Sequence, residues 1–249
     1  MDKSVYFISD LHLGAKYLVP PLDYERRVVK FLYSIKDKAS HLYLLGDILD
    51  YWFEYSTVVP RGYVRFFGAL AALADCGVKV TWIVGNHDIW LFDYLREEIG
   101  LKVVDGGLVA EHSGKRFYLA HGDALGSLKP GFKFIRAIFR NKFCQWLYKL
   151  IPPCWTVPFA HAWSSHSREN GKKYVVKDSE SDRYVQFAYE YNAQNPGSEA
   201  DFFVFGHRHV VFNYHPEKMP KSAVIILGDW IDHTTYGVFD GQNFNLREF

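Results

Sequence analysis

Five short motifs contain residue types that bind metal ions, and together they span most of the chain. They are Asp10-Leu11-His12, Gly46-Asp47-Ile48-Leu49-Asp50, Gly85-Asn86-His87-Asp88, His121-Gly122-Asp123 and Gly206-His207-Arg208-His209. Carboxylate and amide oxygens combined with imidazole nitrogens suit Mn, Fe, Zn or Co better than Ca or Mg alone. Each motif taken alone has an ordinary alternative, such as a strand exit with solvated acids or a helix N-cap. Their joint occurrence favours metal-dependent catalysis.

Short apolar runs directly before the motifs predict the strands that would position them. We expect strands at Val5–Ser9, His41–Leu45, Val78–Val84, Arg116–His121, Phe202–Phe205, Val224–Leu227 and Tyr236–Phe239. Helical patterns lie between them, at Tyr24–Lys38, Gly62–Asp75 and Asp88–Ile99. This alternation predicts a layered α/β sheet covered by helices. All the candidate ligands then lie at the carboxyl ends of strands, where open α/β sheets place ligands.

The motifs also carry local expectations. Asp10 and His12 would project to one side of an extended chain and share one ion. Gly46 would allow a tight turn that directs Asp47 into the cleft. Asn86 can offer a carbonyl oxygen to a metal, and Asp88 can cap a helix that the third motif opens.

Composition limits the class of protein. A chain of 249 residues, 49% hydrophobic and 23% charged, fits one α/β domain with an insertion. Its three cysteines form no CxxC pair, which favours a reducing compartment. The longest stretch without Asp, Glu, Lys or Arg, Leu150 to Ser167, contains three prolines and makes a poor membrane span. We therefore expect a cytoplasmic protein that is soluble or peripheral on the inner membrane.

The segment from Ala124 to Arg168 differs from the rest of the chain. It contains seven cationic residues and no acid, so the remainder, in a chain with a formal charge of +1, has a net charge of −6. Apolar residues from Ile135 to Leu150 recur at helical spacing, which predicts a basic amphipathic helix. A Pro-Pro break and an aromatic stretch, Trp155–Trp163, follow. We interpret the segment as an insertion on the catalytic core, and the acidic remainder argues against nucleic acid as a partner.

The five motifs together resemble the calcineurin-like metallophosphoesterase superfamily. The resemblance implies a layered β-sandwich flanked by helices, formed by one domain over residues 1–249 with a helical cap insertion at 124–195. It also implies two divalent ions, most simply Mn, that activate water for attack on phosphorus. Their ligands would be Asp10, His12, Asp47 and His209 for one ion, and Asp47, Asn86, His121 and His207 for the other. Asp47 would bridge both ions, and His87 would act on the phosphoryl group without binding metal.

Within the superfamily, the chain is similar to the UDP-2,3-diacylglucosamine hydrolases of the lipid A pathway. The similarity includes Asp50-Tyr51-Trp52-Phe53, His121-Gly122-Asp123-Ala124-Leu125, the basic insertion and the polar run Ser167–Lys173. It implies cleavage of a pyrophosphate to UMP and 2,3-diacylglucosamine 1-phosphate. His87 stands where the better-known members have arginine, and Phe132 lies where we expect a tyrosine. The candidate substrate contacts are Asn86, His87, Asp123, Phe132, Arg168, Asn170, Lys172 and Lys173.

Other interpretations of the motifs remain open at this point. The substrate could be a soluble nucleotide or a phosphoprotein, although neither requires a basic aromatic insertion. The insertion could simply be a cap that packs on the core, or a surface that meets anionic lipid headgroups. A metal-free scaffold or a peripheral membrane adaptor on the same fold would be a different class of protein. His161 and His166 lie in the insertion and could touch substrate.

Overall fold

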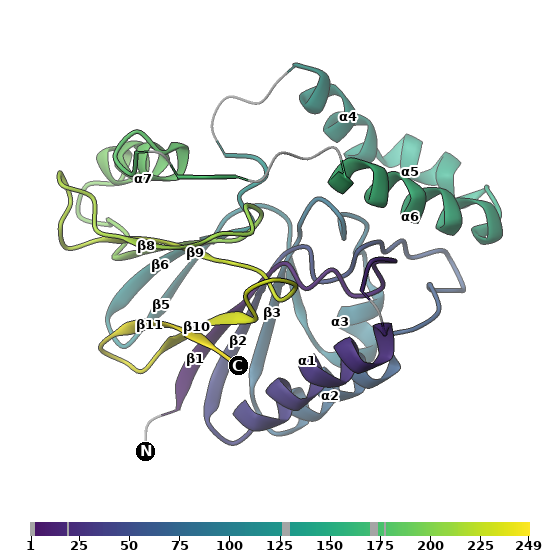
Figure 1. The fold of residues 1–249 in the computed structure, drawn as a ribbon, viewed down its shortest axis with the longest axis horizontal. Coiled ribbons are helices and arrows are strands. Elements are labelled where there is room, and N and C mark those ends of the chain that lie inside the picture. Colours follow the sequence, from purple (N-terminus) through teal and green to yellow (C-terminus); the bar gives the residue numbers. More distant parts are fainter. Residues whose placement is uncertain (1–2, 19, 126–129, 170–173, 177) are drawn as a thin grey trace.

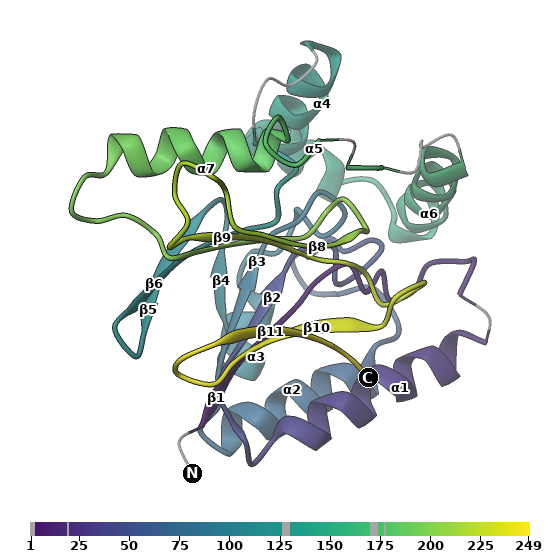
Figure 2. The ribbon, with the colours of Figure 1, turned by 60° about the vertical axis from the view of Figure 1, so that its left-hand side comes forward.

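The computed structural model describes residues 3–18, 20–125, 130–169, 174–176 and 178–249, and at Phe132 and residues 165–169 it describes the backbone only. Two sheets pack face to face between helical layers (Figures 1 and 2). The first sheet has the order β11 (Phe244–Glu248), β10 (Thr235–Phe239), β1 (Ser4–Ile8), β2 (Ala39–Leu45), β3 (Lys79–Ile83), β4 (Lys102–Val104). The second has the order β5 (Leu108–His112), β6 (Lys115–Ala120), β7 (Phe202–Phe205), β9 (Ala223–Leu227), β8 (Val211–Tyr214).

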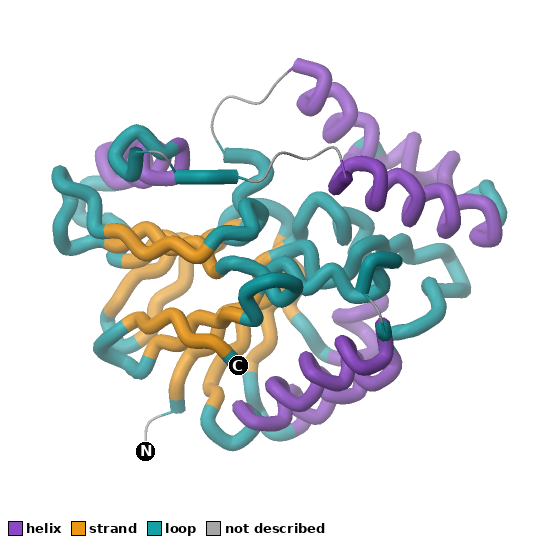
Figure 3. Tube along the Cα trace, in the orientation of Figure 1, coloured by secondary structure: helices purple, strands orange, loops and turns teal. Residues whose placement is uncertain are grey.

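The helices fall into three groups, which Figure 3 separates by colour from strands and loops. α1 (Pro21–Ile35), α2 (Val64–Asp75) and the short α3 (Tyr94–Ile99) cover the outer face of the first sheet. α7 (Arg183–Gln194) covers the outer face of the second sheet. The remaining three helices, α4 (Pro130–Arg140), α5 (Lys142–Lys149) and α6 (Pro153–Glu169), lie above the carboxyl ends of the central strands, and we call them the arm (Figure 1).

Alternation along the strands builds the core. In β1, Val5 and Phe7 point between the two sheets, whereas Tyr6 and Ile8 point toward α1 and α2. Successive side chains of a strand face opposite sides, so a strand with apolar residues at every position is buried on both. The continuous apolar runs in the sequence are therefore the central strands of the two sheets.

The predicted layered α/β fold is confirmed, and all seven predicted strands exist, with ends shifted by at most two residues. The sequence reading missed four strands at or near the sheet edges, namely β4, β5, β8 and β11. These strands are half exposed and carry weaker apolar patterns. They contribute no candidate ligand.

The helix predicted at Asp88–Ile99 is wrong in its first half, because α3 begins only at Tyr94. Asp88 caps no helix. Its buried carboxylate accepts hydrogen bonds from the backbone N–H groups of Gly85 (2.7 Å) and Ile48 (2.8 Å). Glu54 accepts from the N–H groups of residues 92–94 instead. The distant carboxylate of Glu54 therefore satisfies the backbone of residues 92–94, and the chain before Tyr94 is a loop.

The single amphipathic helix expected from Ile135 to Leu150 is two helices. Asn141 interrupts it, since its Oδ1 accepts from the N–H groups of Phe143 (2.9 Å) and Cys144 (3.1 Å) and so caps α5. The aromatic stretch after the Pro-Pro break is also helical, because Pro153 is the first residue of α6, a position where a missing N–H is harmless.

The arm lies within the predicted insertion at 124–195, but α7, which also lies in that range, packs its buried Tyr184, Val185 and Ala188 on the second sheet. The extent of a separate insertion stays a prediction. In the described parts of the chain, no helix combines the length and the apolar character needed to cross a membrane.

Candidate metal centre

The seven predicted metal ligands come from the carboxyl ends of five strands, as the sequence indicates. Asp10 and His12 follow β1, Asp47 follows β2, and Asn86 follows β3. The other three follow strands of the second sheet, His121 after β6 and His207 and His209 after β7. The site therefore lies where the strand ends of both sheets meet, and neither sheet alone could build it.

Five of these seven residues have a left-handed backbone, with φ of 53° at Asp10, 45° at His12, 52° at Asp47, 70° at His207 and 53° at His209. Among the other described residues, only Tyr63, Ser113 and Thr234 combine a side chain with positive φ. Each such residue costs about 1–2 kcal/mol, and such strain gathers at functional sites. The expectation that Asp10 and His12 lie on extended chain is wrong, because both curl into the loop that follows β1. Backbone bonds from Asp10 N to Gly46 O (3.1 Å) and from His12 N to Asp47 O (2.9 Å) hold that loop.

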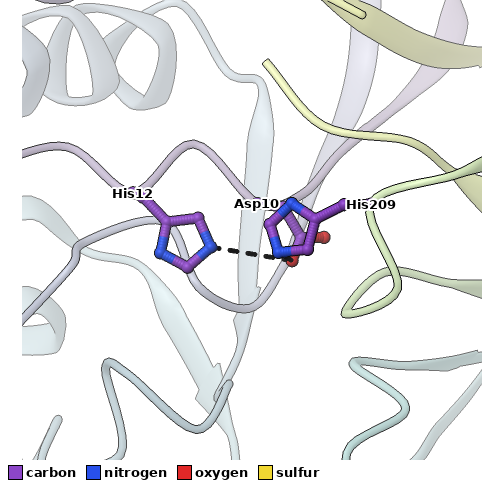
Figure 4. A group of neighbouring side chains, drawn as sticks. All are labelled: Asp10, His12 and His209. Atoms are coloured by element: carbon purple, nitrogen blue, oxygen red, sulfur yellow. Dashed lines mark ion pairs between the residues drawn. The ribbon is translucent and has the colours of Figure 1, made fainter. Parts of the chain in front are cut away.

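Two clusters of candidate ligands form side by side. In the first, Asp10 Oδ1 lies 3.9 Å from His12 Nε2 and 3.6 Å from His209 Nε2 (Figure 4). In the second, Asp47 Oδ2 lies 3.3 Å from His121 Nε2, and His207 lies within ligand range of both.

Two contacts join the clusters or extend them. Asn86 Oδ1 lies 3.1 Å from His121 Nε2, so the amide belongs with the second cluster. His12 Nε2 lies 3.8 Å from Asp47 Oδ2, which places Asp47 between the two clusters. His87 Nε2 also approaches Asp47 Oδ2, at 3.9 Å, and His12, Asp47 and His87 form a third possible ligand group. The geometry alone is compatible with two roles for His87, that of a metal ligand and that of a residue that acts on substrate.

Outer partners aim the histidines at the centre. His121 Nδ1 lies 2.8 Å from the carbonyl oxygen of Leu45, and His209 Nδ1 lies 2.9 Å from Asp229 Oδ2. When Nδ1 donates to these oxygens, Nε2 is left as the atom that can bind metal. Such carboxylate–histidine and carbonyl–histidine pairs are the usual second layer around metal sites.

Two glycines of the motifs lie where there is no room for a side chain. A Cβ at Gly46, which has φ +81°, would lie 2.6 Å from His121 Nδ1. A Cβ at Gly206 would lie 2.5 Å from Asp10 Oδ2. Any other residue at either position would push a candidate ligand aside, so the glycines let the two sheets' loops close on one centre.

The electrostatics favour bound cations. Burial tends to raise the pKa of Asp47, but His121, His87 and His12 outweigh burial and hold that pKa well below its usual range. Burial lowers the pKa of His12 and of His207. The centre thus combines a firmly ionised carboxylate with two imidazoles, those of His12 and His207, that resist protonation, and both are the forms that ligate metals. Burial also tends to lower the pKa of His121, but the charge of Asp47 outweighs burial and raises that pKa well above its usual range, so metal binding there competes with a proton.

Residues of this centre fit a divalent metal. His12 Nε2 is buried and makes no hydrogen bond, although it points at two carboxylates. A buried polar atom without a partner costs about 1–3 kcal/mol, so a metal ion is the partner it lacks. The set of carboxylate oxygens, imidazole nitrogens and an amide oxygen suits a first-row transition ion.

The predicted substrate contacts are less complete. Asp123 is buried and forms an ion pair with Arg136 of α4, which ties the arm to the core. Asn86 and His87 lie in the centre. The side chains of Phe132 and Arg168, and Asn170, Lys172 and Lys173 entirely, lie outside the described residues.

The sequence motifs did not predict the roles of three residues around the centre. Asp229 follows β9 and accepts from His209, and its place at a strand end was a signal that could have revealed it.

Arg208 is the second such residue, and it lies between the rings of Tyr174 and Tyr184, 4.0 and 3.8 Å from their centroids. Its guanidinium also donates to Asp182, the N-cap residue of α7, at 2.6 Å. These contacts fix the His207–His209 loop to α7, and no pattern in the sequence predicts them.

The third is Asp50, which the sequence reading placed in a motif without a role. It is buried beneath α6, and its carboxylate lies 3.5 Å from His12 Nδ1 and 3.7 Å from His87 Nδ1. The residues that follow Asp50 contact the arm. The ring of Phe53 packs on Tyr148 of α5, with centroids 4.6 Å apart, and the Tyr51 hydroxyl lies 3.2 Å from that of Tyr148.

The chain is similar in sequence to known proteins. The chain matches the family described as Calcineurin-like phosphoesterase over residues 3–211. It is 41% identical over 260 aligned residues to the UDP-2,3-diacylglucosamine hydrolase of Porphyromonas gingivalis, covering 99% of this chain and 98% of that protein. It is 29% identical to the protein of the same name from Aeromonas hydrophila, over 92% of this chain and 91% of that one. Among solved structures, the phosphoesterase Yfce from E. coli aligns with a TM-score of 0.47 and 15% identity, over 98% of this chain and 92% of that chain.

Proposed function

The chain belongs to the calcineurin-like phosphoesterase family, and from this premise we propose that it hydrolyses UDP-2,3-diacylglucosamine to UMP and 2,3-diacylglucosamine 1-phosphate. It is a metal-dependent phosphoester hydrolase, and members of its family use a dinuclear divalent metal site. The observation that carries the substrate is the 41% identity to a UDP-2,3-diacylglucosamine hydrolase over nearly the whole of both chains. The similarity includes the arm, which is the part of the chain that phosphoester chemistry alone does not require.

Two Mn²⁺ ions are the cofactors we propose. Asp10, His12 and His209 would hold one ion, and Asn86, His121 and His207 the other, with Asp47 between them. When bound, such a pair activates water and neutralises charge on the phosphoryl group.

His87 is the residue that we propose acts on substrate. Its Nδ1 lies 3.0 Å from the carbonyl oxygen of Asp50, and when Nδ1 donates there, Nε2 faces the centre. Protonated at Nε2, the imidazole can donate to a phosphoryl oxygen or to the leaving group. Asp123, Phe132, Arg168, Asn170, Lys172 and Lys173 remain the proposed further contacts with substrate.

The arm is the proposed meeting place with lipid. Three aromatic residues of α6, Trp155, Phe159 and Trp163, are spaced four residues apart and are 70%, 63% and 54% exposed. Helical spacing places them on one face, and the arm around them carries cations but no acid from residue 124 to 168. An apolar face with surrounding cations suits the surface of an anionic membrane, where a diacylated substrate resides.

Product analysis tests the substrate directly. The full chain with Mn²⁺ is incubated separately with UDP-2,3-diacylglucosamine, bis-p-nitrophenyl phosphate and a dinucleotide polyphosphate. We expect UMP from the first, released at a kcat/KM at least tenfold above the values for the other two. Absence of UMP, with hydrolysis of either soluble compound, would instead identify a nucleotide phosphodiesterase and exclude the lipid substrate.

A further inference from the structure

We propose that α6 helps to build the metal centre: Ser164 and His161 hold the carboxylate of Asp50, and Asp50 in turn positions His87 and His12. The inference rests on the phosphoester hydrolase activity of the chain and holds for any phosphoester that the enzyme accepts. It assigns two positioning residues to a helix that otherwise looks like a substrate cover.

Asp50 makes contacts in two directions. Toward the centre, its Oδ1 lies 3.5 Å from His12 Nδ1 and 3.7 Å from His87 Nδ1, and its backbone carbonyl lies 3.0 Å from His87 Nδ1. Toward α6, Oδ1 accepts a hydrogen bond from Ser164 Oγ at 2.7 Å, and Oδ2 lies 3.3 Å from His161 Nδ1. One buried carboxylate thus joins the cap helix to the rings of a candidate ligand and of the candidate catalytic histidine.

The buried face of α6 is polar at the point of contact. Ser164 is 6% exposed, and its Oγ lies 3.4 Å from His87 Nδ1 as well as on Asp50. His161 also packs edge-on against Tyr51, with ring centroids 5.8 Å apart. On the same helix, Trp155 and Trp163 face solvent.

The inward face of α6 is mixed: Val157 and Ala160 pack against the core as in an ordinary amphipathic helix, whereas Ser164 and His161 meet the carboxylate of Asp50. A helix that served only as an apolar cover would present its large side chains inward. At two of its inward positions α6 instead offers a hydroxyl and an imidazole to the buried carboxylate of Asp50. These two polar residues are explained if their role is to fix Asp50.

Fixing Asp50 matters because both rings that it contacts are at the centre of the chemistry. His12 Nε2 points at Asp10 and Asp47, and the ring of His87 stands edge-on to that of His12, with centroids 4.7 Å apart. If the carboxylate shifts, it no longer restrains the Nδ1 side of either ring, and each ring can turn about its Cβ–Cγ bond. Loss of such an outer partner typically costs 10–100-fold in metal affinity or activity.

The test compares four variants of the full chain, one of which, His161→Gln, removes the imidazole that contacts Asp50. Ser164→Ala removes the donor, Ser164→Thr retains a hydroxyl, and Ala162→Ser places a new hydroxyl two residues away at an exposed position. For each variant, Mn²⁺ binding to the metal-free protein is measured by calorimetry. The kcat and KM are measured with bis-p-nitrophenyl phosphate and with UDP-2,3-diacylglucosamine.

We expect Ser164→Ala to lower kcat about tenfold for every substrate that the wild type accepts and to weaken one class of Mn²⁺ sites several-fold. KM should change less than kcat. Ser164→Thr should recover most of both losses, and Ala162→Ser should match the wild type. His161→Gln should lower kcat in the same way, by a smaller factor, because its contact with Asp50 is longer.

Two results would overturn the inference. One is an Ser164→Ala variant with unchanged Mn²⁺ binding and unchanged kcat. The other is a rise in KM for the lipid alone, which would make α6 a wall of the substrate site only. Failure of the proposed substrate is a separate outcome: the wild type would then release no UMP, while Mn²⁺ binding would still decide the role of Ser164.

Discussion

The metal centre and the arm are built on opposite physical principles. The centre is made of short loops at strand ends, where five left-handed residues are held by buried carboxylates and backbone bonds. The arm is made of ordinary right-handed helices that expose many large apolar side chains, although Phe139 and Tyr148 pack against the core. The first region stores backbone strain that places the ligand atoms, and the second exposes apolar area that we propose meets lipid. The difference separates what performs the chemistry from what we propose selects the substrate.

Removing the metal should affect the two regions most unequally. Chelation by EDTA is expected to abolish activity, with recovery on addition of Mn²⁺. It should also lower Tm by about 5–10 °C, because ligand binding at 100 times its Kd contributes about 2.7 kcal/mol. Hydrogen exchange should quicken in the loops after β1, β2 and β7 and stay unchanged in α1 and α5. Equal loss of protection throughout the chain would contradict the comparison.

Asp47→Asn should show how far the centre depends on one charge. The amide has nearly the same volume but cannot hold two cations together, so kcat should fall about a thousand-fold, or roughly 4 kcal/mol in the barrier. Metal content by elemental analysis should fall from two ions toward one. Asp37→Asn, at an exposed turn, is the matched control. Full activity with two ions in Asp47→Asn would remove Asp47 as the bridge.

His87→Ala separates metal binding from catalysis inside the centre. We expect kcat to fall about 100-fold while both ions remain, because general acid catalysis by one residue is typically worth 10²–10⁴-fold. His215→Ala, at an exposed position, should leave kcat unchanged. Loss of a metal ion from His87→Ala would reassign His87 as a ligand, which its distance of 3.9 Å from Asp47 Oδ2 also allows.

The arm should respond in a different measurement. Replacing Trp155 and Trp163 together by Ser should weaken binding to vesicles of phosphatidylglycerol about tenfold, because apolar area no longer enters the interface. The free energy of unfolding should change by less than about 0.5 kcal/mol, since both side chains are largely exposed. Val64→Ser, which removes an apolar side chain that is 76% exposed on α2, serves as the control. Unaltered vesicle binding in the double variant would remove α6 from the lipid-facing surface.

The smallest expected effect is on the pH dependence of stability, and it concerns His112 in β5 of the second sheet, outside both regions. Burial, together with His41 and Lys79, lowers the pKa of His112 to about 4, and its Nε2 lies 2.8 Å from the Tyr43 hydroxyl. Its pKa in the unfolded chain is about 6.5, so the neutral ring stabilises the fold above that pH and the stability is lost as pH falls from 6.5 toward 4. Because the ring is partly exposed, we expect about 1 kcal/mol, or 2–4 °C in Tm. Scanning calorimetry of His112→Gln should show a flatter fall in Tm between pH 7 and pH 4; a parallel fall would exclude His112 as its source.

The sequence predicted the central strands and the residues at their ends because both are local patterns. A strand buried on both faces must be apolar at every position, and a polar motif directly after it can only lie at its end. That sufficed for Asp10, His12, Asp47, Asn86, His121, His207 and His209. It also predicted the layered fold and metal-dependent phosphoester hydrolysis, both of which are confirmed.

Predictions failed where a distant group satisfies the backbone. The helix expected from Asp88 does not form before Tyr94, since Glu54 accepts from the N–H groups of residues 92–94 and Asp88 itself accepts from Ile48 in the loop after β2. The expected extended chain at Asp10 is left-handed because Gly46 and Asp47 offer carbonyl oxygens from a neighbouring loop. Propensity describes a residue and its neighbours, whereas these partners are 35–40 positions away.

The sequence alone indicates which residues could bind metal and which strands they follow. The tertiary structure was needed to show that Asp50 joins α6 to His12 and His87, that Arg208 contacts two tyrosine rings, and that Ser164 of α6 points inward to a carboxylate. The reason is that an apolar pattern along a helix reports which side chains share a face, but not what that face meets. A polar residue gains its role from the buried group opposite it, and that group is chosen by the fold.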